Sequence, residues 1–93
     1  MIASFKDADT EKLFRTGTSL RIPANLRRVA ARKLAYLHAA RDLEDLRLPP
    51  GNRLEALARD RKGQHSIRVN DQYRICFVWR DGNTHEVEIT DYH

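Results

Sequence analysis

The sequence predicts an α+β domain of two layers, in which two N-terminal helices pack on a C-terminal antiparallel β-sheet. Apolar residues recur every three or four positions in the first part of the chain and at every second position from about residue 66 onward. A Pro-Pro-Gly run at residues 49–51 separates the two patterns. At 93 residues, the chain is expected to form a single domain over residues 1–93.

Two helices are expected before the Pro-Pro-Gly run. Asp7 is suited to cap the first helix and Gly17 to end it, while Pro23 suits the first turn of the second. Lys33 interrupts the apolar stripe of the second helix, so its stem is expected to lie along the core with the ammonium in water. The alternative is that Lys33 marks a surface for an anionic partner. His38 is expected on the surface. The stripe consists of Leu26, Val29, Ala30, Leu34, Leu37 and Ala40.

A further helical turn is expected at residues 43–46, and strands follow the Pro-Pro-Gly run. Residues 1–5 alternate weakly and could form a short first strand. Asp81-Gly82 is a turn signal between two of the later strands. A two-residue loop there would pair Phe77 with Glu86 and bury a mismatch. An odd-length loop with a left-handed Gly82 is therefore expected.

The charge of the chain is unevenly distributed. The net charge is +4. Residues 21–41 carry six basic and no acidic residues, and residues 52–80 carry seven basic and three acidic ones. Residues 81–93 carry four acidic residues and no Lys or Arg. Such blocks indicate a polyanionic partner, nucleic acid first, with an ion-paired solvated surface as the alternative.

The composition also limits the classes of protein. No apolar run approaches the roughly 20 residues that span a bilayer, so no membrane contact is expected. The single cysteine, Cys76, excludes an internal disulfide and indicates a cytoplasmic location. One Cys and four scattered His lack the spacing of a zinc site, so neither a metal nor another cofactor is expected. A nucleophilic thiol is disfavoured because no His is assured near Cys76, although Arg74 and Arg80 would lower its pKa.

Chemistry-bearing side chains gather at the end of the sequence. Asp91, Tyr92 and His93 directly follow an apolar strand, and a protonated imidazole can act as a general acid. A frayed terminus is the alternative. Glu55 could be a base or simply a solvated carboxylate. Three arginines could form a cationic floor for phosphates on the face of the sheet away from the helices: Arg68, Arg74 and Arg80.

Several motifs together resemble the HigB toxins, RelE-like killer proteins of plasmid-maintenance and host-inhibition toxin–antitoxin systems. The resemblance covers essentially the whole chain, and the combination of a terminal Asp-Tyr-His with an upstream Asp-Arg-Lys-Gly-Gln is specific. The sequence departs from the family pattern in three places. Glu55 stands where some relatives have His, Ala58-Arg59 stands where Lys-Gly is common, and Tyr73 stands where Trp is usual. The matching runs lie at residues 1–6, 43–46, 52–57, 60–70, 72–77 and 87–93.

The resemblance implies a RelE-like fold and an mRNA endonuclease that cuts in the ribosomal A site without a metal. It also implies a HigA-type antitoxin, a helix-turn-helix DNA-binding protein that represses the operon together with the toxin by binding operator DNA. By motif position, Asp91, Tyr92 and His93 match the active-site terminus of the family. Arg74 matches a basic residue that serves RNA binding or phosphate stabilisation.

Metal-free RNA cleavage needs a base, cations and an acid. We expect Glu55 or Asp91 as the base or orienting group and His93 as the acid, with Tyr92 stacking on or orienting a nucleobase. The expected cations are Arg74, Arg68 and Arg59. The competing hypothesis is a module without catalysis that binds nucleic acid or the ribosome and inhibits by occlusion. The further RNA-binding candidates are Arg59, Arg61, Lys62, Arg68 and Arg80.

Overall fold

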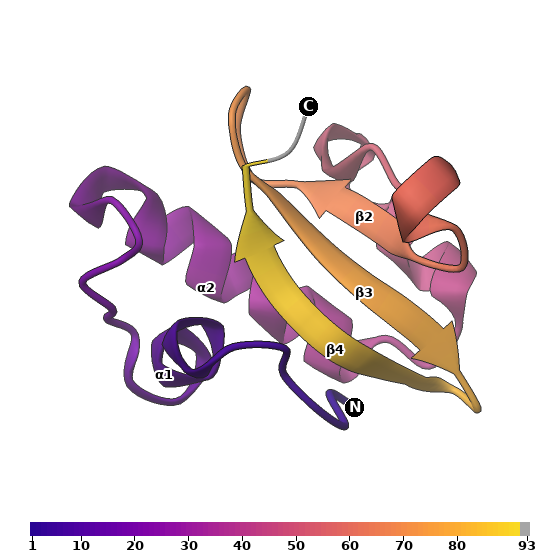
Figure 1. The fold of residues 1–93 in the computed structure, drawn as a ribbon, viewed down its shortest axis with the longest axis horizontal. Coiled ribbons are helices and arrows are strands. Elements are labelled where there is room, and N and C mark those ends of the chain that lie inside the picture. The colour runs from indigo at the N-terminus through magenta and orange to yellow at the C-terminus, as the bar shows by residue number, and fades with distance from the viewer. Residues whose placement is uncertain (92–93) are drawn as a thin grey trace.

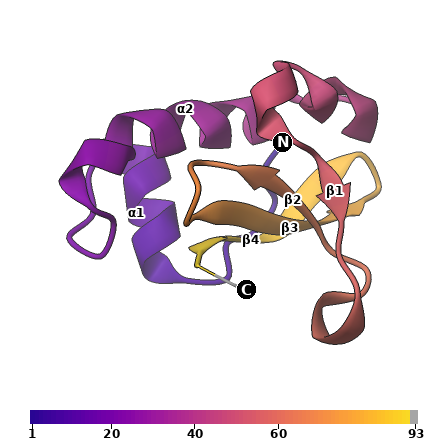
Figure 2. The ribbon, with the colours of Figure 1, turned by 90° about the horizontal axis from the view of Figure 1, so that it is seen from above.

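The computed structural model describes residues 1–91, in which two α-helices pack on a four-stranded antiparallel sheet (Figure 1). Helix α1 spans Ala8–Thr16 and helix α2 spans Ala24–Ala39. Helix α2 lies along one face of the sheet, and α1 lies beside β4 (Figure 2). The predicted two-layer α+β architecture is confirmed. The strands, which neighbour one another in chain order, are β1 (Glu55–Ala56), β2 (His65–Arg68), β3 (Arg74–Arg80) and β4 (Asn83–Thr90).

The core lies between the helices and one face of the sheet. Each fully buried aliphatic or aromatic side chain contributes about 1.5–3 kcal/mol relative to an exposed one, so this layer supplies most of the stabilisation. Among residues 1–91, no helix has the length and apolar character needed to cross a membrane. The fully buried core residues include Leu13, Leu34, Leu37, Ile67, Ile75, Phe77 and Val87.

Short 3-10 helices occupy much of the connection between α2 and β2. The helical turn expected at residues 43–46 is present as η1, Leu43–Arg47, and Asp42 closes its N-terminus in a capping box. The two-residue edge strand β1 was not predicted, because so short a strand carries no alternation that a sequence pattern can register. The other two short helices are η2 (Pro50–Asn52) and η3 (Arg59–Arg61).

Local sequence signals set the ends of α1. The Asp7 carboxylate accepts a hydrogen bond from the Thr10 amide at 2.7 Å, and Gly17 ends the helix in the left-handed conformation at φ 79°. Both predictions are therefore confirmed. Arg21 forms ion pairs with Asp7 at 3.2 Å and with Asp9 at 3.3 Å, which fixes the loop between the helices on the start of α1.

The β3–β4 hairpin turns through two residues, so the expected odd-length loop is wrong. Arg80 pairs with Asn83, which leaves only Asp81 and Gly82 in the turn. Their φ angles of 54° and 77° are both in the left-handed region. This is the geometry of the tight turns whose twist matches that of paired strands, and Asp-Gly is a preferred sequence for it.

A β-bulge in β4 prevents the burial of Glu86 opposite Phe77, which the odd-length loop was expected to avoid. The register shifts between Cys76 and Val78, where Glu86 and Val87 together lie opposite Phe77. Glu86 adopts φ 51° and is exposed. The extra residue returns the apolar side chains that follow it to the core face, because alternation in a strand has a period of two.

The N-terminal segment runs along the outer edge of β4. Residues 1–5 do not form the expected strand; instead Ile2 and Phe5 make isolated parallel bridges to Thr84 and Val87. The three-residue step between the bridged residues on the N-terminal side equals the step across the bulge on β4. The segment therefore follows the bulged contour of the strand.

Side chains cover further backbone groups along the same edge. The Glu86 amide donates to Ser4 Oγ at 2.9 Å, and the Ile89 amide donates to Thr10 Oγ1 at 3.1 Å. The Ile89 carbonyl accepts from Arg21 Nη2 at 3.3 Å. An edge strand with paired backbone groups is protected from pairing with another chain, and here it is also held in place to within one residue of its end.

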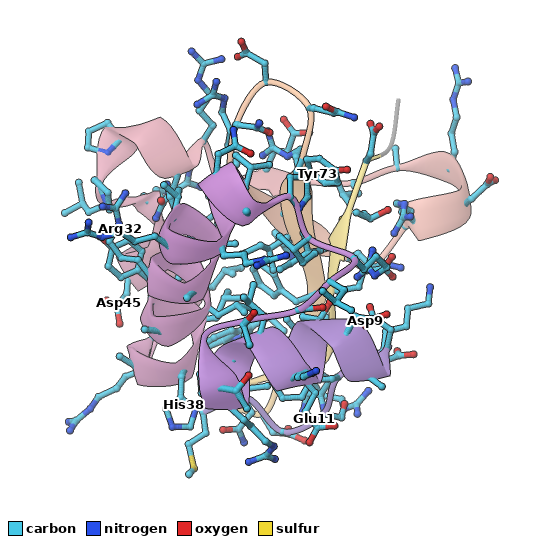
Figure 3. All side chains as sticks on the ribbon, turned by 90° about the vertical axis from the view of Figure 1, so that its left-hand side faces the viewer. Asp9, Glu11, Arg32, His38, Asp45 and Tyr73 are labelled. Atoms are coloured by element: carbon cyan, nitrogen blue, oxygen red, sulfur yellow. The ribbon has the colours of Figure 1, made fainter. Side chains whose placement is uncertain are left out.

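Two polar residues of α2 are placed differently from the predictions, and Figure 3 labels the first of them, His38. His38 is half-buried rather than on the surface: its Nδ1 accepts from the Ile2 amide at 3.2 Å and its ring lies 5.2 Å from that of Phe14. The Lys33 side chain does not lift its ammonium into water. It is only 6% exposed and donates to Asn52 Oδ1 at 2.5 Å, whereas the neighbouring Arg32 points away from the sheet.

The bulge makes a prediction about stability. Glu86→Gly should raise the free energy of unfolding by about 0.5–1 kcal/mol, because a left-handed conformation strains residues that carry a Cβ. Glu86→Val should lower it by about 1–2 kcal/mol, because β-branched residues tolerate positive φ least. Urea unfolding measures both variants, and equal effects of Gly and Val would contradict the bulge.

Candidate active site on the outer face of the sheet

Four side chains stand in one row across the face of the sheet that is turned away from α2. Glu55 on β1 pairs with Ser66 on β2, Ser66 pairs with Cys76 on β3, and Cys76 pairs with Glu88 on β4. Directly paired residues point to the same side of a sheet. We call this side the outer face. At about 4.8 Å per strand, the two carboxylate-bearing positions lie roughly 14 Å apart.

Arg74 occupies the next row of the outer face, opposite Arg68 on β2 and Thr90 on β4. Its Nε donates to Ser66 Oγ at 2.7 Å, and its Nη2 donates to the Arg53 carbonyl at 2.7 Å. These hydrogen bonds hold the guanidinium in one plane, next to the row of side chains that begins with Glu55. A fixed, planar cation of this kind is suited to bidentate contact with phosphate.

The register of β4 brings Asp91 to the same end of the sheet. Asp91 comes directly after Thr90, which pairs with Arg74. Its Oδ2 accepts a hydrogen bond from Gln72 Nε2 at 2.9 Å, across the turn that precedes β3. Tyr92 and His93, which follow, lie outside the described residues. The structure thus brings Asp91 and Arg74 to the same end of the sheet.

Glu88 is a central residue of the outer face that the sequence analysis did not select. Its side chain is 13% exposed, and its Oε2 lies 3.0 Å from Lys6 Nζ and 3.8 Å from Arg61 Nη1. The signal was the strand period: Glu88 has the parity of Thr90, which lies on the outer face, rather than that of Val87. The bulge obscured the row to which it belongs.

The segment from Glu55 to Arg61 walls a hollow of about 670 Å³ beside the outer face. Arg59 adopts a left-handed φ of 56° within it and is exposed, as is Lys62 at its end. Arg61 turns inward to Gln64 Oε1 at 3.2 Å. Positive φ at non-glycine residues is concentrated at functional sites because surrounding contacts must maintain it.

The proposed floor of three arginines is only partly assembled. Arg68 and Arg74 are direct neighbours in the register, and Arg68 ion-pairs with Asp71. Arg80 lies at the other end of β3, about 20 Å from Arg74 at 3.3 Å per residue, and its Nη2 lies 3.3 Å from His85 Nδ1. The expected grouping of Arg80 with the other two is therefore wrong.

Comparison with known proteins identifies the family of this chain. A family model described as the RelE-like toxin of type II toxin–antitoxin system HigB matches residues 3–93. The chain belongs to this family. Toxin HigB-1 of Vibrio cholerae is 46% identical over 83 residues, which are 88% of this chain and 87% of that protein. An uncharacterized protein of Haemophilus influenzae is 37% identical over 84 residues, covering 89% and 83% of the two chains.

Membership establishes the broad role of the molecule. It is a toxin of a type II toxin–antitoxin system, a family that is generally of the endoribonuclease type, and membership implies an antitoxin partner. The observed α+β fold agrees with RelE-like toxins. Within residues 1–91, no three side chains of His, Cys, Asp or Glu are grouped closely enough to hold a metal ion.

Cys76 of this HigB-family toxin is buried under charged side chains. It is inaccessible to solvent, and burial raises the pKa of its thiol to about 11, with Glu88 adding to the rise, although Arg61, Arg74 and Lys6 oppose it. The expected net lowering of this pKa is wrong, because desolvation outweighs the opposing effect of the arginines. The thiol is therefore suited to packing rather than to nucleophilic attack.

This environment predicts the reactivity of Cys76. At pH 8 the folded toxin should react with iodoacetamide about 100-fold more slowly than the urea-unfolded toxin, because its thiol pKa lies about two units above the ordinary value of 9.0. Mass spectrometry of timed samples measures both rates. Similar rates in the two states would show that the thiol is accessible and ionised in the folded protein.

Proposed function

We propose that this toxin cleaves mRNA in the ribosomal A site and so inhibits translation. The observation that carries the proposal is the β3–β4 register. It pairs Arg74 with Thr90, so Asp91 follows at the end of the sheet where Arg74 lies, while hydrogen bonds to Ser66 and Arg53 anchor the Arg74 guanidinium. Ser66 accepts a hydrogen bond from Arg74 and pairs with Glu55, so the strand positions of a cation and a carboxylate both neighbour this serine.

The proposed reaction is an attack of a ribose 2′-oxygen on the adjacent phosphorus. The 2′-hydroxyl proton passes to a carboxylate, the new O–P bond forms, and charge builds on the non-bridging oxygens. The bond to the 5′-oxygen then breaks, and that oxygen takes a proton from a general acid. The products are a cyclic phosphate and a free 5′-hydroxyl, so no other reactant is consumed.

We assign the cationic role to Arg74 and the acid role to His93, with Glu55 or Asp91 as base or orienting group. Hydrogen bonds to Ser66 and to the Arg53 carbonyl fix Arg74, so little reorganisation is needed when the phosphorane forms. The hydrogen bond from Gln72 supports an orienting role for Asp91. Tyr92 is proposed to stack on a nucleobase near the cut.

The remaining basic residues are proposed to bind the RNA backbone around the cut. Arg59 and Lys62 are exposed beside the hollow next to Glu55, and Arg68 neighbours Arg74. Arg61, whose Nη1 lies 3.8 Å from Glu88 Oε2, borders the same hollow. Arg80 is about 20 Å away, so it would contact RNA or ribosome only outside the scissile nucleotide.

The partners follow from this proposal. The ribosome would place the mRNA on the outer face, since the site has few groups of its own to align a substrate. The antitoxin is proposed to be of the HigA type, a helix-turn-helix protein through which the complex binds operator DNA. Translation places the activity in the cytoplasm.

Brief induction followed by mapping of mRNA 5′ ends tests this function. New 5′-hydroxyl ends should appear within translated codons, and a His93 deletion expressed at the same level should produce none and permit growth. Growth arrest by the intact toxin without new ends would instead establish inhibition by occlusion. Arrest and cleavage by the His93 deletion would contradict the acid assignment.

Arginine substitutions test the cationic role. Arg74→Ala should lower the cleavage rate by about 10²–10³, the usual effect of removing one transition-state donor. Arg27→Ala removes the same charge from α2, where its side chain binds the Ile22 carbonyl, and should change the rate less than about 3-fold. Arg74→Lys should restore only part of the loss. Equal losses at Arg27 and Arg74 would indicate diffuse electrostatic binding, and single-turnover cleavage on programmed ribosomes measures all three.

A further inference from the structure

The Arg53 carbonyl is one of three oxygens that accept hydrogen bonds from Arg74, and the other two belong to Ser66. Arg74 Nη2 donates to this oxygen at 2.7 Å, while Nε donates to Ser66 Oγ at 2.7 Å. The serine lies on β2, next to Arg74's own strand, so the sheet fixes it. The Arg53 carbonyl lies at the end of η2, outside the sheet, so contacts other than strand pairing must hold it in position.

Arg53 presents its carbonyl through an unusual backbone conformation. It ends η2 in the left-handed region, with φ 46° and ψ 57°, and its amide donates to the Pro50 carbonyl at 3.2 Å. A residue with a Cβ stays there only when neighbouring contacts maintain it. The residue before it, Asn52, supplies such contacts.

Asn52 is fully buried and fastens η2 to the preceding turn. Its Nδ2 donates to the carbonyls of Leu46 and Leu48, both at 3.1 Å, and its backbone amide donates to the Pro49 carbonyl at 2.9 Å. The side-chain oxygen that remains accepts a hydrogen bond from Lys33 Nζ at 2.5 Å. Helix α2 is thereby linked to the residue that precedes Arg53.

The Lys33 ammonium is an unusual partner for a buried amide. Lys33 is 6% exposed, and burial lowers the pKa of its ammonium, with Arg32 and Arg68 adding to the effect. No ion pair joins it to a carboxylate among residues 1–91. Because an apolar residue would serve packing at least as well, the contact with Asn52 calls for a role other than stability.

We propose that Lys33 and Asn52 are positioning residues for Arg74: together they hold the Arg53 carbonyl where it fixes the plane of the guanidinium. The catalytic part of this inference rests on the proposed function. The structural part does not, because the order of the Arg74 side chain can be measured without RNA.

The order of Arg74 tests the structural part. The Nε–Hε signal of Arg74, assigned by its loss in Arg74→Lys, should be rigid and slow to exchange in ¹⁵N spectra of the whole toxin. Lys33→Met should make it mobile and speed its exchange about 10-fold or more. Asn52→Asp, which keeps an acceptor for Lys33 but loses both amide donors, should have the same effect. Arg27→Met is the matched control on α2 and should leave the signal unchanged.

The results have definite consequences. A mobile Arg74 in the wild-type toxin overturns the proposal without any variant, and so does a rigid Arg74 in a folded Lys33→Met or Asn52→Asp protein. Circular dichroism identifies a variant that fails to fold, in which case the other variant decides. Equal mobility in Arg27→Met would also overturn it, because the effect would then be general loosening of the fold.

Kinetics test the catalytic part. In Lys33→Met, kcat for cleavage on programmed ribosomes should fall about 10- to 100-fold, the loss expected from a small displacement of a catalytic group, while KM changes less than about 2-fold. A change confined to KM would overturn the positioning role. If the wild-type toxin does not cleave RNA, the proposed function fails while the order of Arg74 still decides the structural part.

Discussion

The bulge at Glu86 and Val87 decides which residues of β4 face the helices. Without it, the two-residue turn at Asp81-Gly82 would put the strand one residue out of register, and every later side chain would change sides. Ile89 would then leave the core. The same shift would remove Glu88 from its row on the outer face. The core and the candidate site therefore both depend on one inserted residue, Glu86. Its amide donates a hydrogen bond to Ser4 Oγ in the N-terminal segment.

Much of the positive charge is used inside the molecule. In the basic block at residues 21–41, Arg21 binds two aspartates and the Ile89 carbonyl, Arg27 binds the Ile22 carbonyl, and Lys33 binds Asn52. These contacts fix the helices and β4 rather than meet a partner. The second block, around Arg59 and Arg74, borders the hollow and the outer face, and several of its members are also bound within the molecule: Arg61, Arg68 and Arg74. Net charge alone does not distinguish the two blocks.

Local signals predicted the helices well, because caps such as Asp7 and Gly17 act within a few residues. Contacts between distant residues were less accessible. The bulge depends on the N-terminal segment, and the burial of Lys33 depends on Asn52, 19 residues away. The sequence itself offered Glu55, Arg74 and Asp91, the resemblance added matching motif positions for Arg74 and Asp91, and the register places these two at the same end of the sheet. The two-residue period of a strand predicted which face carries Arg80, but it could not predict the separation of Arg80 from Arg74 along the strand.

The pairing of residues 1–6 with β4 joins segments about eighty residues apart in the chain: Met1 with Thr84 and Ser4 with Glu86. Contacts of this kind give a fold a high contact order, and closure of so long a loop slows the search for the native state. During synthesis, the apolar sides of α1 and α2 stay uncovered until the β4 segment has emerged. The nascent chain is then exposed to aggregation and to chaperones for most of its translation.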